Sequence, residues 1–203
     1  MEVKLKKELK RNILLKSAYL LFTKKGYEKT TIGDIASRAG LGKGTFYLYF
    51  KDKEDIRNTL IILKSSQLLK KAVKEVKVIN ENEEFVERLI NLADYLIDYL
   101  SYDRELLKFI SKSLSWGLFM NSAKYESKSE DIIDLDMFIK ELIQQNNVTL
   151  DNPELTIFTI IELVNSTVYS TVINSEPTTI EEFKPFLFDE IRLITSAHIV
   201  KQM

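Results

Sequence analysis

Apolar residues recur along most of the chain at spacings of three and four, which is the period of an amphipathic α-helix. In the first segment Leu14, Ala18 and Phe22 would form one buried face, and Gly26 is placed to end the helix. The alternation typical of half-buried β-strands is nearly absent, and the 203 residues include only six glycines and three prolines. The pattern predicts an all-α protein with roughly nine helices.

Two short helices are expected next, separated by a very short connection. Thr31 followed by Asp34 is a capping-box pattern, so a helix begins there and runs to about Ala39. Gly42 is a tolerable N-cap for a third helix over residues 43–50. These caps and the periodicity describe two short helices joined by a glycine-containing turn.

A long fourth helix over residues 53–77 is predicted from the capping residue Asp52, with Asp55 at the third helical position. The polar sequence INENEE (79–84) then marks the best candidate boundary. Five further helices are expected at about 85–101, 104–120, 130–146, 153–174 and 180–201. Pro185 does not fit an uninterrupted helix in the last of these stretches, so we expect a break or a late start there.

The formal net charge of −1 conceals a strong asymmetry between two parts of the chain. Residues 1–77 carry 19 Lys and Arg against 8 Asp and Glu, whereas residues 78–203 carry 10 against 22. This segregation suggests two parts with different partners, of which the basic one is a candidate for nucleic acid or a membrane surface. A solvated lysine face is the plainer alternative. We expect two domains, residues 1–55 and 56–203, linked by the long helix.

Composition excludes several other classes of protein. Hydrophobic residues make up 45% and charged residues 29% of the chain, which is ordinary for a globular protein. With no cysteine there is neither a disulfide framework nor a thiolate metal site. No apolar run approaches the roughly 20 residues that cross a bilayer, and the N-terminal segment lacks the apolar stretch of a signal peptide. We expect a cytoplasmic protein that is not bound to a membrane.

The two short helices have the arrangement of a helix-turn-helix, whose second helix enters a DNA major groove. Phe46 and Phe50 are four residues apart and would point inward together. The opposite face would carry Lys43, Gly44, Tyr47 and Leu48. At Gly44 the missing side chain leaves room for the backbone of a ligand. Backbone N–H groups at Thr31 and Lys53 could each meet a phosphate.

Residues 26–56, GYEKTTIGDIASRAGLGKGTFYLYFKDKEDI, strongly resemble the helix-turn-helix segment of the TetR family of bacterial transcriptional regulators. With the amphipathic helix before it, the match covers about the first 60 residues. The resemblance implies a homodimer whose two recognition helices read a partly palindromic operator in double-stranded DNA. It also implies a C-terminal regulatory domain with a dimer interface and a pocket for a small-molecule effector.

The resemblance assigns DNA contacts to residues of the second, third and fourth helices. These are Thr31, Lys43, Thr45, Tyr47, Leu48, Tyr49 and Lys53. Gly44 is also predicted to bind DNA, because it lies on the outer face of the third helix. Tyr49 and Lys53 would hold phosphates. Lys43, Thr45 and Tyr47 would lie nearest the base edges.

One departure from the family concerns the start of the third helix. Leu41-Gly42 stands where family members often have Val-Ser, and that serine would cap the helix and could reach a phosphate. Replacing a serine N-cap by glycine lowers helix stability by only a few tenths of a kcal/mol. The glycine therefore leaves the predicted fold unchanged but removes the hydroxyl that could contact a phosphate. Lys4, Lys6 and Lys7 would either add phosphate contacts as a flexible arm or form a solvated basic tail.

Two stretches of the acidic part suit the dimer interface that the resemblance implies. Residues 155–173, LTIFTIIELVNSTVYSTVI, are apolar nearly all round, as in a helix that is buried on two sides. Residues 187–200 carry an apolar stripe. We expect a homodimer through helices 153–174 and 180–201, with burial inside a single chain as the alternative.

A ligand pocket in the acidic part would need apolar walls with a few polar groups. The candidate residues are Phe109, Trp116, Met120, Met137, Glu162, Asn165 and Tyr169. Asn165 and Tyr169 are four residues apart, with Glu162 a turn earlier. Apolar walls with a few polar groups favour a small lipophilic ligand, and the absence of arginine among the candidates disfavours a strongly anionic one. An ordinary core position is the alternative for each.

The sequence supplies no constellation for catalysis. The one histidine, His198, lies near the C-terminus without a triad or metal motif, and there is no glycine loop for phosphate. We predict no enzyme, no cofactor and no metal, but a ligand-responsive repressor that a small molecule releases from its operator. The first alternative is a family member without an inducing ligand, acting as an activator, co-repressor or architectural protein. An all-α interaction scaffold or enzyme is the remote one.

Overall fold

The computed structural model of the chain describes residues 2–79, 84–111, 135–145 and 148–200. These residues form helices joined by short connections, and none of them lies in a β-strand, although one isolated bridge pairs Leu150 with Ile199. The chain divides into two compact units, Met1–Ile62 and Leu63–Met203. The predicted all-α class is confirmed.

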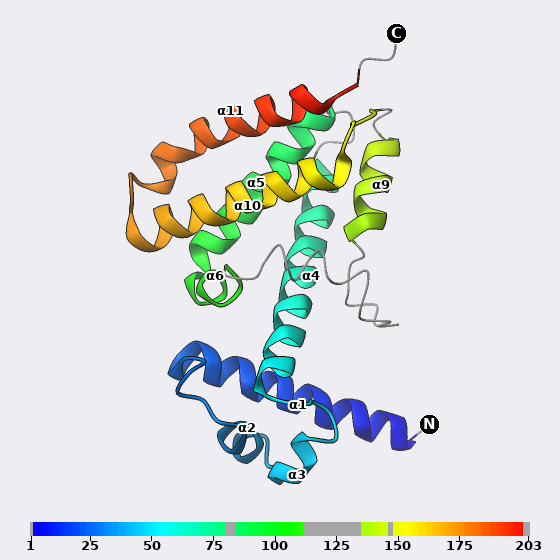
Figure 1. Ribbon diagram of the computed structural model, residues 1–203, viewed down its shortest axis with the longest axis vertical. Helices are drawn as coiled ribbons and strands as arrows, with labels where there is room; N and C mark the ends of the chain where they lie inside the picture. Colours follow the sequence, from blue (N-terminus) through cyan, green and yellow to red (C-terminus); the bar gives the residue numbers. More distant parts are fainter. Residues whose placement is uncertain (1, 80–83, 112–134, 146–147, 201–203) are drawn as a thin grey trace. The chain divides into compact units, whose positions relative to one another are not determined.

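The first unit consists of three helices and the start of a fourth. They are α1 (Glu2–Lys25), α2 (Ile32–Arg38), α3 (Lys43–Phe46) and α4 (Lys53–Ile79) (Figure 1). Their buried apolar residues recur at the helical period and meet in one core. The largest fully buried side chains of this core are Leu14, Ile35, Phe46, Phe50, Ile56, Ile61 and Ile62. Because α2 and α3 are too short to be stable alone, this shared core holds them in place.

α1 reaches back to Glu2, so the basic residues Lys4, Lys6 and Lys7 belong to a helix. The expectation of a flexible arm there is therefore wrong. The segment is rich in Lys, Glu and Leu, which favour helix, and neither glycine nor proline interrupts it. At the other end Gly26 adopts φ +88°, the left-handed conformation that ends a helix, as predicted.

Side-chain caps begin α2 and α4 at the predicted residues. Thr31 Oγ1 accepts a hydrogen bond from the Asp34 amide (3.1 Å), and Asp34 Oδ2 accepts one from the Thr31 amide (2.9 Å), which completes the capping box. Asp52 Oδ1 accepts from the Asp55 amide at 2.8 Å. Gly42 is the N-cap of α3 and supplies no side-chain hydrogen bond. The predicted caps are confirmed.

α3 is shorter than the predicted helix over residues 43–50, because regular helix ends at Phe46 and turns follow it. The amides of Tyr49 and Phe50 both donate to the Phe46 carbonyl, at 3.0 Å each, which tightens the chain after the helix. The rings of Phe46 and Phe50 lie 5.7 Å apart between centroids. The segment therefore keeps its two predicted inner residues together although the helix is shorter.

The second unit contains the rest of α4 and the following helices. They are α5 (Phe85–Tyr102), α6 (Arg104–Ile110), α9 (Leu135–Gln145), α10 (Pro153–Tyr169), the π-helical turn η1 (Ser170–Asn174) and α11 (Ile180–His198). α10 and α11 lie side by side and run in opposite directions, and α5 contacts both (Figure 1). The helices predicted over 104–120 and 130–146 lie in part outside the described residues.

α11 is continuous through Pro185, so the predicted break or late start is wrong. Thr179 caps the helix, with its Oγ1 accepting from the Glu182 amide at 3.4 Å. The proline lies within the first two turns, where it removes a single backbone hydrogen bond. Burial of Leu187 and Ile191 further along stabilises the helix against that loss.

Ion pairs join α11 to α5. Lys184 Nζ donates to Asp94 Oδ1 at 2.5 Å and also to Asp98. Arg192 donates from Nε and Nη2 to the two carboxylate oxygens of Glu87, at 2.9 and 3.3 Å. Burial lowers the pKa of Lys184, but the hydrogen bonds to the two aspartates outweigh it and the net pKa is raised. These pairs fix the position of α11 along α5.

Candidate functional site

The segment from α3 to the turn after it has one buried and one exposed side. Phe46 and Phe50 are 0% and 2% exposed, whereas Tyr47 is 52% and Leu48 74% exposed. Lys43 and Gly44 are also exposed, and Thr45 and Tyr49 are half-buried. The Tyr47 ring meets the Phe46 ring edge-on, with centroids 5.6 Å apart, so packing orients it while half of it remains accessible. The predicted division into an inner and an outer face is confirmed.

Neither Gly42 nor Gly44 is required by the conformation of the first unit. A Cβ built at either residue meets no atom within 4 Å, and neither has the positive φ found at Gly26 and Gly40. Glycine inside a helix costs roughly 0.5–1 kcal/mol relative to alanine. Gly44 therefore lowers the stability of α3 without an intramolecular reason, which is what the close approach of another molecule would explain.

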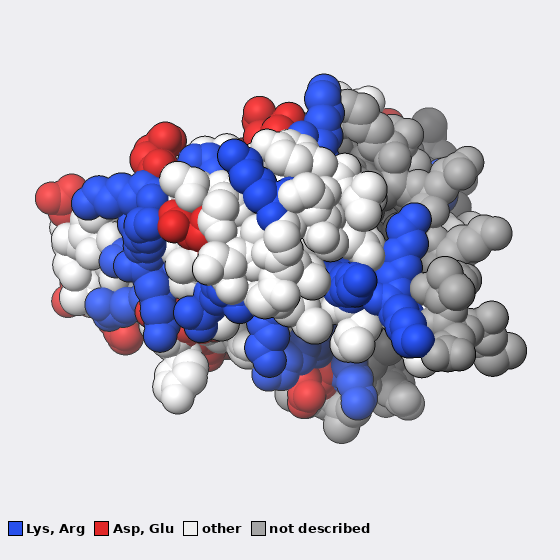
Figure 2. All heavy atoms as spheres, turned by 90° about the horizontal axis from the view of Figure 1, so that it is seen from below, with Lys and Arg blue, Asp and Glu red and all other residues white. Residues whose placement is uncertain are grey.

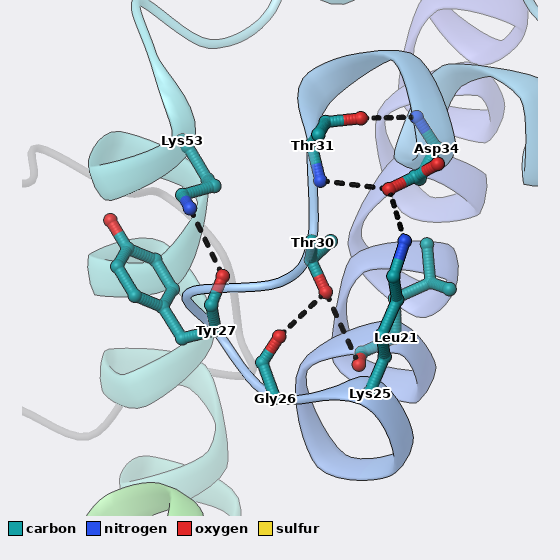
Figure 3. A network of polar contacts seen from close by, with 8 residues as sticks. All are labelled: Leu21, Lys25, Gly26, Tyr27, Thr30, Thr31, Asp34 and Lys53. Atoms are coloured by element: carbon teal, nitrogen blue, oxygen red, sulfur yellow. Dashed lines mark hydrogen bonds and ion pairs between the residues drawn. The ribbon is translucent and has the colours of Figure 1, made fainter.

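The start of α2 presents a hydroxyl group that is held in place (Figure 3). Lys25 Nζ donates to Asp34 Oδ2 at 2.7 Å, beside the capping box. The hydrogen bond from Lys25, with that from the Thr31 amide, lowers the pKa of Asp34 to about 2. The Thr31 oxygen accepts one hydrogen bond in the capping box and keeps its own proton to donate. An exposed donor at this place suits a phosphate oxygen.

Lys53 is held at the start of α4 by Tyr27 (Figure 3). Its Nζ donates to the Tyr27 carbonyl at 3.0 Å and lies 4.2 Å from the centroid of the Tyr27 ring. An ammonium group has three N–H donors, so Lys53 keeps two for a phosphate. Burial raises the pKa of the Tyr27 phenol against the opposing effect of Arg57.

Arg57 is a neighbour that the sequence prediction did not include. Its guanidinium lies 5.0 Å from the same Tyr27 ring, so two cations share one aromatic side chain. Arg57 follows Lys53 by four residues on the same face of α4, and this spacing was the available signal in the sequence.

On the face of the molecule that Figure 2 shows, basic side chains are more numerous than acidic ones, which lie among them. The exposed basic residues of α1, α2, α3 and their connections include Lys10, Lys16, Lys24, Lys25, Lys29, Arg38, Lys43 and Lys51. Such a surface attracts the phosphate backbone of DNA independently of base sequence. The outer face of α3 therefore lies in basic surroundings.

The second unit contains an apolar cavity of about 100 Å³ that is lined by residues of α4, α5, α9 and α10. Of the residues that the structure describes around it, all are apolar except Ser65 and Asn165. Asn165 Nδ2 donates to the carbonyl of Ser111 at 2.6 Å. Within the described part of the chain, neither Asn165 Oδ1 nor Ser65 Oγ has a hydrogen-bond partner. The cavity is thus suited to a lipophilic molecule with few polar atoms.

Among the residues predicted to bind a ligand, Asn165 lines this cavity. Trp116 and Met120 lie outside the described residues. The other four, of which Met137 is exposed and the rest half-buried, do not line it: Phe109, Met137, Glu162 and Tyr169. Their contact with a ligand stays a prediction.

Ser65 was missing from that prediction. It follows Ile61 and Ile62 and precedes Leu68 and Leu69 at helical spacing, and all four are buried. A small polar residue embedded in the apolar stripe of α4 was the signal in the sequence.

α10 and α11 each bury one apolar face and expose a second. Large exposed side chains are Leu155 and Phe158 on α10 and Phe186 and Leu193 on α11, all more than 40% exposed. By length and composition alone Pro153–Asn174 could cross a membrane, a test that the core helix of a soluble protein also passes. Exposed apolar residues on two adjacent helices are typical of a surface that another protein covers.

His198 pairs with a carboxylate near the start of α10. Its Nδ1 lies 2.8 Å from Asp151 Oδ1, and the Asp151 amide donates to the His198 carbonyl at 3.0 Å. The described residues contain no group of three or more His, Cys, Asp or Glu that could hold a metal ion. The contacts of His198 thus tie the end of α11 to the chain before α10.

The chain is similar in sequence to known bacterial transcriptional regulators. Residues 14–60 match the family model for bacterial regulatory proteins of the tetR family. An uncharacterized HTH-type transcriptional regulator of Bacillus subtilis, YvdT, is 31% identical over 159 residues, which are 76% of this chain and 78% of YvdT. Two other regulators of the same organism match over 45 residues only, 16% of each.

Solved structures share the fold over nearly the whole chain. The transcriptional regulator FadR from Bacillus subtilis, in complex with stearoyl-CoA, is 22% identical with a TM-score of 0.57, covering 88% of this chain and 96% of FadR. SmeT, the repressor of the Stenotrophomonas maltophilia multidrug efflux pump SmeDEF, is 16% identical with a TM-score of 0.60, covering 94% and 91%. At these identities the likeness extends to the fold alone.

Proposed function

Because the chain belongs to the TetR family of bacterial regulatory proteins, we propose that it is a repressor that binds a palindromic operator as a homodimer and is released by a small lipophilic ligand. The observation that carries the DNA-binding part is the outer face of α3. Tyr47 and Leu48 are exposed there, and neither the backbone conformation nor neighbouring atoms require glycine at residue 44. A short helix with these properties in basic surroundings suits the major groove.

The contacts divide into two kinds. Lys43, Thr45 and Tyr47 approach base edges from α3, where they contribute to sequence specificity. Thr31 and Lys53 bind phosphates from the starts of α2 and α4, since each keeps a hydrogen-bond donor after its intramolecular contacts are made. At the start of α3, Lys43 and Gly44 lie closest to the DNA in this proposal. Leu48 and Tyr49, after the helix, also contact the DNA.

The homodimer is proposed to form through α10 and α11. Their exposed apolar residues Leu155, Phe158, Phe186 and Leu193 would be covered by the same surface of a second copy. Two-fold symmetry then presents two α3 segments to two operator half-sites, which successive major grooves separate by about 34–36 Å. The protein acts in the cytoplasm and has no enzymatic role in this proposal.

Release by a ligand would act through α4. This single helix carries Ile56 and Leu60 in the core of the first unit and Ser65 and Leu68 in the wall of the cavity. A ligand that enters the cavity would shift α4 and so favour states in which the two α3 segments are wrongly spaced for DNA. That FadR holds an acyl-CoA and SmeT is a repressor supports the proposal by analogy of fold.

An electrophoretic retardation assay with DNA from upstream of the protein's own gene tests the proposal. We expect binding that weakens steeply with salt and is largely lost in Tyr47→Ala, because the exposed half of its ring is the part proposed to contact the bases. The matched control is Tyr102→Ala, which removes a tyrosine that is 93% exposed in the second unit. Wild-type affinity in Tyr47→Ala would contradict the placement of α3 on DNA.

Gly44→Ala separates DNA contact from folding. Alanine at this open helical position should raise stability by about 0.5–1 kcal/mol and reduce operator affinity at least about tenfold, because its methyl group lies where DNA approaches. Thermal unfolding and the retardation assay measure the two effects. Unchanged affinity would mean that no close partner meets this helix.

A further inference from the structure

The ring of Tyr27 contacts two cations of α4, and we call Tyr27, Lys53 and Arg57 the ring cluster. Lys53 Nζ lies 4.2 Å and the guanidinium carbon of Arg57 5.0 Å from the ring centroid. Both distances are within the roughly 6 Å over which a cation and an aromatic face attract each other. Lys53 Nζ also donates to the Tyr27 carbonyl at 3.0 Å. One residue of the connection between α1 and α2 thus holds two positive charges near each other.

Carboxylates lie near the ring cluster without pairing with its cations. Burial is the main cause of the raised pKa of the phenol in this cluster, and the negative charges of Glu54, Glu28 and Asp52 add to it. Within the described part of the chain, these carboxylates form no ion pair with either cation, since Asp52 caps α4 and the two glutamates are exposed. Like charges four residues apart on a helix repel each other. An anion from outside the chain would relieve this repulsion.

The hydrogen-bond donors of the ring cluster suit a phosphate group. The ammonium group of Lys53 keeps two N–H donors after its bond to the Tyr27 carbonyl. The guanidinium of Arg57 has five, and none of them donates to another residue that the structure describes. Its planar fork matches two oxygens of one phosphate. Both side chains are half-buried, so they lose less conformational freedom when an anion binds.

The ring cluster lies beside residues that are proposed to contact DNA. Figure 3 shows Tyr27 and Lys53 at one end of the connection and Thr31 at its other end, where α2 begins. The distance between the two cationic centres cannot exceed the sum of their distances to the ring centroid. A DNA backbone that meets Lys53 therefore passes within reach of Arg57.

We propose that Arg57 binds a backbone phosphate of DNA beside the one that Lys53 binds, and that Tyr27 is the positioning residue that holds both cations. The inference rests on the proposed DNA-binding function and adds two residues to it. Contacts to phosphates carry no sequence information, so the ring cluster strengthens binding to any duplex and leaves base readout to α3.

Fluorescence anisotropy titrations of the full-length protein test the contact at several salt concentrations. The probes are DNA from upstream of the protein's own gene and an unrelated duplex of the same length. Arg57→Met should weaken binding to both about tenfold at about 0.1 M salt. It should also lower the slope of log affinity against log salt by about one for each protomer on the DNA. Arg57→Lys, which keeps the charge, should retain most of the slope.

Arg104→Met is the matched control, because it removes the same charge from an exposed residue of the second unit. Its slope should equal that of the wild type. A slope in Arg57→Met that also equals the wild-type slope would overturn the phosphate contact. A loss of affinity confined to the upstream DNA would overturn it too, since it would assign Arg57 to base readout.

Variants of Tyr27 test the positioning role. Tyr27→Leu removes the ring and should weaken binding to both duplexes severalfold, whereas Tyr27→Phe keeps the ring and should bind like the wild type. In a protein that already carries Lys53→Met and Arg57→Met, Tyr27→Leu should have no further effect on DNA affinity. An equal loss in that background would overturn the positioning role and assign the effect to packing against Phe22, whose ring lies 5.3 Å away between centroids. Thermal unfolding verifies that each variant is folded at the assay temperature.

The two duplexes also separate this inference from the proposed function. Equal affinity of the wild type for both, with a lowered slope in Arg57→Met, would support the ring cluster and contradict a sequence-specific regulator. Preference for the upstream DNA, with an unchanged slope in Arg57→Met, would support the regulator and contradict the ring cluster. A wild type that binds neither duplex would contradict both.

Discussion

The polar contacts of the two units differ in sequence range. In the first unit they join residues three to 26 positions apart, as in the Thr31–Asp34 capping box and the contact of Lys53 with Tyr27. The second unit has local contacts too, such as the Thr179–Glu182 cap, but it adds contacts between residues 47 to 105 positions apart, the longest being Arg192 with Glu87. The first unit is therefore organised by local sequence, and the second by which helices meet.

This difference explains where function can be recognised. The outer face of α3 is defined by residues within one short segment, so its spacing alone indicates a DNA-binding surface. The cavity of the second unit takes its walls from four helices, and only the folded chain brings Ser65 and Asn165 to the same cavity. Substitutions in each unit test whether the two are organised in these different ways.

The largest expected effect is that of Phe46→Ala. Phe46 is fully buried, so its removal should cost about 3–5 kcal/mol and unfold much of the first unit, with loss of operator binding. Hydrogen exchange measured by mass spectrometry should show lost protection in residues 14–62 and retained protection in α5, α10 and α11. Tyr47→Ala, on the exposed side, is the control. Equal loss of protection in both units would contradict their separate organisation.

A smaller effect is expected from Lys184→Met in the second unit. The variant leaves Asp94 and Asp98 without their shared cation and should lose about 1 kcal/mol, because both carboxylates are partly exposed to water. Urea denaturation measures the change. Lys184→Arg, which keeps the charge and the donors, should lose less. If the methionine variant is as stable as the wild type, distant ion pairs do not organise this unit.

Asp34→Asn tests the local network through its pH dependence. The pKa of Asp34 is lowered to about 2 in the folded state from its ordinary value of 3.8, chiefly by the hydrogen bond from Lys25. The ionised carboxyl therefore stabilises the fold above about pH 4, and this contribution disappears as pH falls through 2. The wild type should melt at a higher temperature than Asp34→Asn at pH 6, and this difference should shrink steadily as pH falls from 4 toward 2. A difference that does not change with pH would show that the charge of Asp34 is irrelevant.

The smallest effect is expected from Gly42→Ser. The position has φ −71° and open space for a Cβ, so a serine can cap α3 and should raise stability by a few tenths of a kcal/mol. Its hydroxyl should also strengthen operator binding severalfold through a phosphate. Gly42→Ala has the same backbone constraint without the hydroxyl, and should give neither gain. Tighter operator binding by the alanine variant would assign the effect to the backbone.

Sequence patterns predicted the caps at Thr31 and Asp52 and the burial of Phe46 and Phe50, because each depends on neighbours within a few residues. The same patterns failed at Pro185, where they predicted a break. A local preference against proline in a helix gave way to the burial of Leu187 and Ile191 and to the pairing of α11 with α5. The spacing of apolar residues along one helix does not predict which distant helices that helix will contact.

The all-α class, the family and the outward side of α3 could be predicted from the sequence alone, because helical period, capping and glycine placement act over short distances. The length of α3, the continuity of α11 and the composition of the cavity depend on tertiary contacts. Only the tertiary structure shows that Asn165 Oδ1 and Ser65 Oγ are buried without a described partner. Burial and hydrogen-bond satisfaction belong to the packed chain, since they depend on atoms that the sequence places far apart.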